Sequence, residues 1–222
     1  MPTKTPSQAD FPSSLTVTIT LPPNPTSSPS PNILLLLHGL VPFDLGGFHW
    51  GDDVAFDSST GGLDMDAGFT RSPAILVKDL VRGVLVQKCG YRPREILVLG
   101  FGQGGMAGLS LARELGKAGE GVDSEPLAGV ISIGAPYPLS GSRAGSKNRT
   151  PVLLVSGRDS VVVSDEAVRR TKQVFEFVEV SRYARKGDGM PSNRDEMLPI
   201  MQFFARRLRS RQGVPEGSVE LG

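Results

Sequence analysis

The sequence predicts an α/β fold in which a mostly parallel sheet is flanked by helices. Short apolar runs that suit buried strands alternate along the chain with segments of helical periodicity, which is the order typical of a parallel sheet. The runs 33–37 and 151–155 are apolar throughout, as expected of strands covered on both faces. Residues 96–109 add a strand, a glycine-rich turn and a helix in direct succession. Together these observations favour a single, strand-and-helix domain.

The first half of the chain is expected to contain a further strand, a long loop and a helix. Residues 15–21 (LTVTITL) alternate apolar residues with threonine, which predicts a half-buried strand that could cover the run 33–37. Residues 41–71 are rich in glycine and aspartate, which indicates a long surface excursion. Ser72 and Pro73 then supply an N-cap and a proline at the first helical position, so we expect a helix that runs from there towards Cys89.

The second half continues the alternation. A strand is expected over 127–133, and Ser164 with the two acidic residues after it begins a short helix. Residues 174–180 alternate as a strand, and 195–209 form a basic amphipathic helix. The apolar residues of that helix are expected to be Met197, Leu198, Met201, Phe204 and Leu208.

Charge and composition exclude several classes of function. The formal net charge is +1 and no basic stretch stands out, so nucleic acid is not an expected partner. The single cysteine, Cys89, cannot form an intramolecular disulfide and suits a reducing compartment. No apolar run reaches the roughly 18 residues of a membrane span, and the N-terminus lacks the apolar region of a secretory signal. We therefore expect a cytoplasmic protein, with one domain over 14–210 and disordered tails at 1–13 and 211–222.

Three segments carry a resemblance to a known family. They are ILLLLHGL (33–40), GFGQGG (100–105) and PVLLVSGRDSVV (151–162). The chain resembles the phospholipase/carboxylesterase branch of the α/β-hydrolases, which includes the acyl-protein thioesterases. The resemblance implies an α/β-hydrolase-like fold, a site for esters or thioesters, and no cofactor or metal. It extends from about residue 15 to residue 208.

The resemblance places the site residues, and two of them differ from the family. The nucleophile position of the G-x-S-x-G elbow is Gly102, which has no side chain that can attack a carbonyl. In the family a histidine follows a G-x-G pattern after the last strand; here that position is Met190. The only histidines are His38 and His49, both far from that position. The acid of the triad corresponds to Asp159, which is shifted by one residue relative to the family and could equally be a turn residue.

The oxyanion hole is expected to be better preserved than the triad. Its donors in the family are backbone N–H groups, which correspond to Leu40 and Gln103 and do not depend on side-chain identity. The alternative for residues 100–105 is a Gly-rich loop that binds phosphate, but no acidic residue follows at dinucleotide-binding distance. An acidic loop with calcium-like composition, formed by Asp52, Asp53, Asp57, Asp64 and Asp66, does not have EF-hand spacing.

The chain is also shorter than the family after its first central strand. The family has a helix and another central strand between the His-Gly-Leu segment and the segment with the tryptophan. Here only residues 41–49 separate Leu40 from Trp50, which is too few for both elements. We therefore predict a sheet that lacks one central strand and leaves 33–37 at an exposed edge, which favours aggregation.

Three hypotheses about function follow from these residues. The leading hypothesis is a non-catalytic pseudo-hydrolase that binds an acyl or ester small molecule, an acylated protein or another partner. The second is an active carboxylic ester or thioester hydrolase with unrecognised catalytic residues, for which Ser110 is a poor candidate because it lies about two helical turns from Gly102. The third is a truncated product without function. The sequence does not fix the oligomeric state.

Overall fold

A five-stranded parallel sheet forms the centre of the computed structural model, which describes residues 2–13, 15–23, 29–40, 47–56, 61, 64–66, 68–117 and 125–208. The strands lie in the order β1-β2-β3-β4-β5, and each described pairing is parallel. Their bounds are β1 Ile33–Leu37, β2 Ile96–Phe101, β3 Gly129–Ile133, β4 Val152–Ser156 and β5 Val178–Arg182. The predicted α/β class and mostly parallel sheet are thus confirmed.

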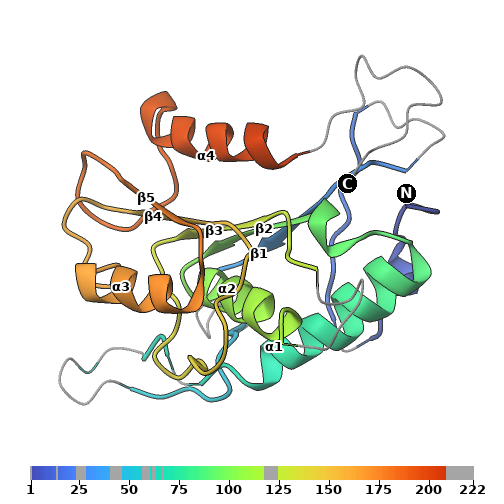
Figure 1. The fold of residues 1–222 in the computed structure, drawn as a ribbon, viewed down its shortest axis with the longest axis horizontal. Helices are drawn as coiled ribbons and strands as arrows, with labels where there is room; N and C mark the ends of the chain where they lie inside the picture. Colours follow the sequence, from blue (N-terminus) through green and yellow to red (C-terminus); the bar gives the residue numbers. More distant parts are fainter. Residues whose placement is uncertain are drawn as a thin grey trace.

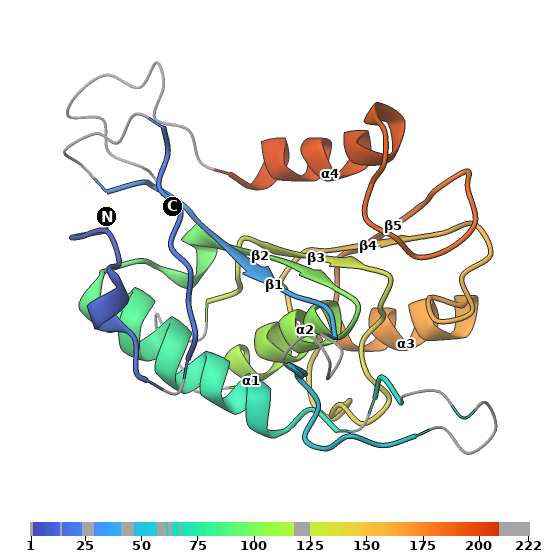
Figure 2. The same cartoon turned by 180° about the vertical axis from the view of Figure 1, so that it is seen from behind.

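Helices cover the two faces of the sheet unequally. Helices α1 (Arg71–Ile75), α2 (Gln103–Leu115) and α3 (Asp165–Val174) lie on one face, and α4 (Arg194–Arg207) lies alone on the other (Figure 1). The view from behind shows the same two layers (Figure 2). Helix α1 continues directly into the π-helical segment η3 (Leu76–Lys88), while η1 (Gln8–Asp10) and η4 (Pro93–Glu95) are single 3₁₀ turns. Within the described residues, no helix is both long and apolar enough to cross a membrane.

Most expected elements are present near their expected bounds. The helix after residue 70 begins at Arg71 with Thr70 as its N-cap, two residues before the expected cap. The carboxylate of Asp52 accepts hydrogen bonds from the backbone N–H groups of Thr70 and Arg71. A side chain distant in the sequence therefore caps the N-terminus of α1. Ser164 caps α3 as expected, because its hydroxyl accepts from the N–H of Ala167.

Three sequence predictions about elements are wrong. Residues 15–21 form no strand and do not join the sheet, and Leu34 and Leu36 of β1 remain 45% and 68% exposed. The strand expected over 174–180 begins only at Val178, because Val174 ends α3 and Phe175 is buried in the core.

The apolar side of α4 also differs from its prediction. The side chains that α4 buries are Glu196, Ile200 and Phe203, of which the two apolar ones join the smaller core cluster. The predicted residues Met197, Leu198, Met201 and Leu208 are each 39–54% exposed. Of the predicted residues, Phe204 alone packs against this cluster. Periodicity did not predict the rest, because α4 lies alone on its face of the sheet (Figure 1) and leaves its other apolar residues exposed.

The N-terminal residues lie against the end of η3. The N–H of Thr3 donates to the carbonyl of Cys89 at 2.8 Å, and Lys88 Nζ donates to the carbonyl of Asp10 at 2.7 Å. We expected a tail at 1–13, and the boundary of the domain at residue 14 stays a prediction. The tail expected at 211–222 lies outside the described residues.

Strand β1 has one described neighbour, β2, and presents alternate residues to two environments. Ile33, Leu35 and Leu37 pack in the larger core cluster, whereas Leu34 and Leu36 lie on the opposite face with substantial exposure. An apolar strand at a sheet edge exposes unpaired backbone groups together with apolar side chains. This edge is therefore the expected place for self-association through strand pairing.

The exposed edge predicts opposite effects of lysine at two adjacent positions. Leu36→Lys should reduce aggregation while changing the free energy of unfolding by no more than about 0.5 kcal/mol, because the side chain is exposed. Leu37→Lys should destabilise by several kcal/mol, because Leu37 is 7% exposed and belongs to the larger core cluster. Light scattering and thermal unfolding measure both effects. Equal destabilisation by the two substitutions would show that the edge is covered.

Candidate functional site

The turn between β2 and α2 has the geometry of a nucleophile elbow. Gly102 has φ 52° and ψ −121°, a conformation that L side chains rarely adopt. Its N–H donates to the carbonyl of Ile133 at 2.9 Å, and its own carbonyl accepts from the N–H groups of Gly105 and Met106. The turn is therefore held by the end of β3 on one side and by the first turn of α2 on the other.

The first turn of α2 packs directly against the end of β1. A Cβ at Gly104 would overlap the carbonyl oxygens of Leu37 and His38, so only glycine permits this approach. Leu40 follows His38 by two residues and Gln103 is the first residue of α2, so the segments of both expected backbone donors meet here. The convergence of the two N–H groups on one oxygen atom stays a prediction.

The side chain of Gln103 joins two loops above the elbow. Its Oε1 accepts from the N–H of Trp50 at 3.0 Å, and its Nε2 donates to the carbonyl of Met65 at 3.3 Å. Gln103 is 2% exposed, so these hydrogen bonds replace those it would form with water. The sequence predicted only a backbone role for Gln103. Its side-chain amide also holds the loops of Trp50 and Met65 in place. A glutamine between glycines at the start of a helix is the sequence signal for this role.

Both histidines lie in the segments beside the elbow. The ring of His38 lies 4.8 Å from that of Trp50, whose Nε1 donates to the carbonyl of His38 at 2.8 Å. His49 is the residue before Trp50, and its Nδ1 is buried with no hydrogen-bond partner within the described part of the chain. Neither histidine belongs to the loop after β5, where the family places its base.

Asp159, the predicted acid position, contacts the loop that carries Met190, the predicted base position. The carboxylate of Asp159, three residues after β4, accepts from the N–H of Gly187 at 3.1 Å. Gly187 precedes Met190 by three residues in the same loop, and Met190 is 49% exposed. Asp159 follows β4, which is separated from β2 by one strand. At ordinary strand spacing, β4 and β2 lie about 10 Å apart.

A second carboxylate, which the sequence did not single out, contacts the residues on either side of Asp159. Asp188 accepts from the N–H of Gly157 at 2.8 Å and from the hydroxyl of Ser160 at 2.6 Å. A Cβ at Gly134, the residue after β3, would lie 3.0 Å from the Cβ of Asp188. Asp188, in the loop after β5, therefore hydrogen-bonds to the loop after β4 and packs against the residue after β3. No sequence signal distinguishes it from an ordinary loop aspartate.

Arg185 supports the loop that carries Met190. Its Nη2 donates to the carbonyl of Met190 at 2.8 Å, and its Nε donates to Glu196 Oε1 at 2.9 Å. The other oxygen of Glu196 accepts from the N–H and the hydroxyl of Ser192. Burial acts to raise the pKa of Glu196, but the hydrogen bonds from Ser192 and Arg185 outweigh it and hold the pKa below the ordinary 4.5.

The aspartates of the long loop serve structural hydrogen bonds. Asp52 caps α1, and Asp66 accepts from the N–H of Leu139 and the hydroxyl of Ser140. Over the described residues no cluster of three or more histidine, cysteine or acidic side chains could hold a metal ion, and Asp57 lies outside those residues. These contacts agree with a loop whose acids organise its own backbone.

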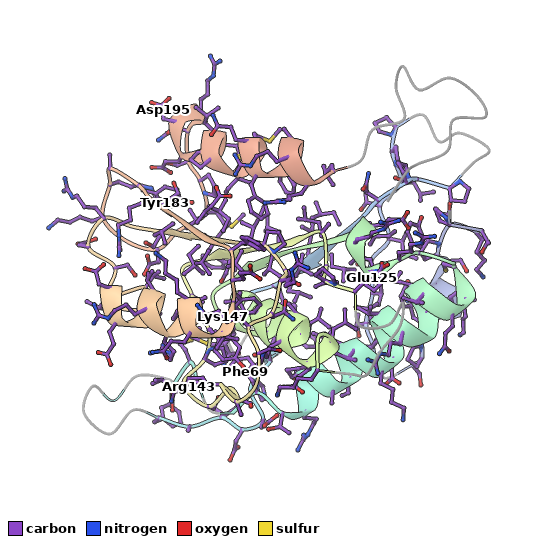
Figure 3. The ribbon with its side chains drawn as sticks, in the orientation of Figure 1. Phe69, Glu125, Arg143, Lys147, Tyr183 and Asp195 are labelled. Carbon is purple, nitrogen blue, oxygen red and sulfur yellow. The ribbon has the colours of Figure 1, made fainter. Side chains whose placement is uncertain are left out.

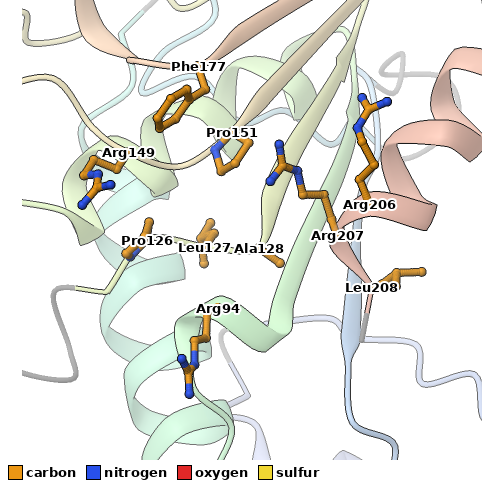
Figure 4. A pocket seen from close by; sticks show the side chains of 10 residues that line it. All are labelled: Arg94, Pro126, Leu127, Ala128, Arg149, Pro151, Phe177, Arg206, Arg207 and Leu208. Atoms are coloured by element: carbon orange, nitrogen blue, oxygen red, sulfur yellow. The ribbon is translucent and has the colours of Figure 1, made fainter. Parts of the chain in front are cut away.

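A cavity of about 590 Å³ lies far from this site, near the amino ends of the strands (Figure 4). Its lining contains four arginines, but three of them lie near glutamates that offset their charge. The distances are 3.9 Å for Arg94–Glu125, 3.7 Å for Arg149–Glu176 and 2.6 Å for Arg206–Glu179. Arg207 packs over the ring of Phe203. This cavity has little net charge to attract an anion.

Residues 37–207 match the Phospholipase/Carboxylesterase family. This match covers more than half of the chain, so the protein belongs to that family. The resemblance drawn from the three sequence segments is thereby confirmed. A comparison with curated proteins gives no match.

Solved structures of esterases and thioesterases share the fold. Esterase PE8 is similar with a TM-score of 0.58 and 20% identity, over 81% of this chain and 94% of that one. A phospholipase/carboxylesterase from Dyadobacter fermentans has a TM-score of 0.51 and 16% identity, over 78% and 89%. Acyl-protein thioesterase 2 from Zea mays has a TM-score of 0.50 and 18% identity, over 84% and 97%. At these identities the likeness establishes the α/β-hydrolase-like fold.

The elbow conformation predicts a stability cost for a side chain at position 102. Gly102→Ala should reduce the free energy of unfolding by about 1–3 kcal/mol, because alanine must adopt a positive φ. Space is not limiting, since the new Cβ would lie 3.6 Å from Met65 Cε. Gly189→Ala is the comparison; its φ is not positive, but its Cβ would lie 3.2 Å from Arg185 Nη1, so the guanidinium must shift slightly and the cost should be smaller than that of Gly102→Ala. Equal costs in urea unfolding would contradict the strained turn.

Acid should remove the contribution of Glu196 to stability. A carboxyl whose pKa is lowered in the folded state stabilises the protein above the ordinary value of 4.5, and this contribution is lost as pH falls through the folded-state pKa. The wild type should therefore unfold at a higher temperature than Glu196→Gln at pH 7, and the difference should shrink below about pH 4.5. Glu166→Gln, at an exposed position in the first turn of α3, should show a smaller difference, because its carboxylate is held only by the helix dipole. A gap between wild type and Glu196→Gln that stays constant down to pH 2 would be inconsistent with this assignment.

Proposed function

We propose that the protein is a non-catalytic, cytoplasmic member of the phospholipase/carboxylesterase family that binds an acyl or ester group without hydrolysing it. The observation that carries the proposal is Gly102, which stands at the elbow with φ 52° and ψ −121°. In a serine hydrolase this position presents the attacking oxygen. Glycine keeps the shape of the turn and brings no atom that can form an acyl-enzyme bond.

The residues that surround the elbow also support binding without turnover. Met190 stands where the family pattern has a base, and a thioether does not accept or donate a proton in the neutral range. The backbone N–H groups of Leu40 and Gln103 can still donate to a carbonyl oxygen, and the start of α2 favours negative charge. Carbonyl recognition would thus persist while the covalent chemistry is missing. The ligand would be an ester or acylated small molecule, or an acylated protein.

The nearby serines offer weak support for the rival hypothesis of an active hydrolase. Ser132 is fully buried and donates to the carbonyl of Ala135 at 2.6 Å. Ser160 donates to Asp188 and accepts from the N–H of Val163, which suits a turn. Ser110 lies on α2 about 12 Å along the helix axis from the elbow. Among the described residues, none of these three hydroxyls hydrogen-bonds to a histidine.

Binding of an uncleaved ester tests the recognition half of the proposal. Titration of methyl butanoate into ¹⁵N-labelled protein should shift the amide resonances of Leu40 and Gln103 together. Leu40→Pro removes one donor, because proline has no N–H, and should weaken the binding. Shifts confined to other regions, or none at concentrations of a few millimolar, would refute carbonyl recognition at the elbow.

Reconstruction of the missing groups tests the catalytic half. Wild type, Gly102→Ser and Met190→His should each hydrolyse p-nitrophenyl butanoate at no more than trace rates, because each lacks the nucleophile or the base. The double variant should gain measurable activity, far beyond the sum of the singles, because a serine and a histidine act as one unit. Asp159, already bonded to the loop of residue 190, is available to orient the imidazole.

The outcome of that assay separates the hypotheses. Wild-type turnover of about 1–1000 per second would overturn the non-catalytic proposal and favour an active hydrolase. A folded double variant as inert as the wild type would show that the elbow and position 190 do not form one site. Circular dichroism verifies that each variant is folded, since serine at position 102 carries the strain of a positive φ.

A further inference from the structure

A second cavity, of about 500 Å³, lies on the face of the sheet that α1, α2 and α3 cover, away from the elbow. It opens between the start of the η3 helix, the outer surface of α2 and the loop 137–142. Phe69, which lines it, lies on the opposite side of the sheet from Asp195 at the start of α4 (Figure 3). The volume falls in the range of about 300–1,000 Å³ that small-molecule sites occupy.

One wall of this cavity is apolar and rigid. Phe69 and Val77 are 7% and 8% exposed and belong to the larger core cluster. Ala74, one turn before Val77 on the same helix, stands at the exposed mouth. Side chains fixed by the core give a preformed surface for an aliphatic or aromatic group, so a ligand would not need to order them.

The opposite wall holds a buried hydroxyl that lacks a partner. Ser110 on α2 is 3% exposed, and its Oγ has no hydrogen-bond partner within the part of the chain that the structure describes. Buried polar atoms in proteins are nearly always hydrogen-bonded. The neighbouring hydroxyl of Tyr137 is already used, because it donates to the carbonyl of Ser142 at 2.9 Å. Ser110 is therefore the donor that remains for a bound molecule.

Two charged side chains, Glu114 and Lys78, line the cavity, and the carboxylate of Asp66 lies beside the lining, where it accepts from the N–H of Leu139 and the hydroxyl of Ser140. Glu114 lies 2.5 Å from Lys117, which offsets its charge. Lys78 lines the cavity from the η3 helix, is exposed, and forms no ion pair with any described residue. Burial keeps the phenol of Tyr137 neutral by raising its pKa to about 12. A ligand carboxylate would meet an unpaired ammonium group and no unpaired acid of the lining.

We infer that this cavity binds a small amphipathic carboxylate. Its apolar part would pack on Phe69 and Val77, and its carboxylate would accept from the hydroxyl of Ser110 and pair with Lys78. This site is separate from the elbow and does not depend on whether the elbow binds an acyl group. Its chemistry differs as well, because it recognises a free carboxylate through a side-chain cation.

Titration with hexanoate, hexanol and hexylamine tests the inference on the full chain. In ¹⁵N spectra hexanoate should shift the amides around Ser110, Val77 and Tyr137 with a dissociation constant in about the millimolar range, hexanol should bind more weakly, and hexylamine should not bind. No shift in this region with hexanoate, or equal binding of all three probes, would overturn the proposal. Shifts only at Leu40 and Gln103 would assign hexanoate to the elbow and overturn it too.

Three variants assign the contacts. Ser110→Ala should weaken hexanoate binding about two- to tenfold, the effect of one net hydrogen bond. Lys78→Gln should weaken it about two- to fivefold and leave hexanol unchanged, while Lys172→Gln, an exposed lysine on α3, should change neither. Ala74→Trp should block all binding by filling the mouth. Full affinity in Ala74→Trp, or equal effects of the two lysine variants, would refute the site.

Discussion

The close approach of α2 to the end of β1 is the contact on which the rest of the site depends. Gly104 lies against the carbonyl oxygens of Leu37 and His38, where any side chain would overlap them. This approach brings the segment after β1 beside the start of α2, and it allows the side chain of Gln103 to reach the backbone of Trp50 and Met65. A larger residue at position 104 would separate both loops from the elbow.

The site is therefore a set of loops tied at the carboxyl ends of parallel strands. Gly102 is bonded to the end of β3, and Asp188 joins the loops after β3, β4 and β5. Arg185 then connects the loop of Met190 to Glu196 at the start of α4. In this arrangement the carboxylates of Asp159 and Asp188 accept from backbone N–H groups, so the geometry of these loops does not depend on a histidine.

The sequence predicted the elements whose signals are local. The apolar run of β1, the glycine turn at Gly102 and the cap at Ser164 each dictate structure through neighbours in the chain, and all are present. Predictions that depended on distant contacts fared differently. Residues 15–21 have strand-like alternation but no strand pairs with them, and α4 buries Ile200 and Phe203 rather than the stripe of Met197 and Met201. Periodicity alone does not say how wide a sheet face a helix must cover.

The same limit applies to the site. Family motifs predicted Gly102, Asp159 and Met190 as site positions, but only the fold places Asp188 beside Gly134 and the amide of Gln103 between two loops. Covalent labelling with a fluorophosphonate, followed by intact mass measurement, tests the central claim that the elbow has kept its shape without its chemistry. We expect no adduct on the wild-type protein under conditions that fully label an active serine esterase. Stoichiometric modification of one serine would contradict it and identify the protein as a working hydrolase.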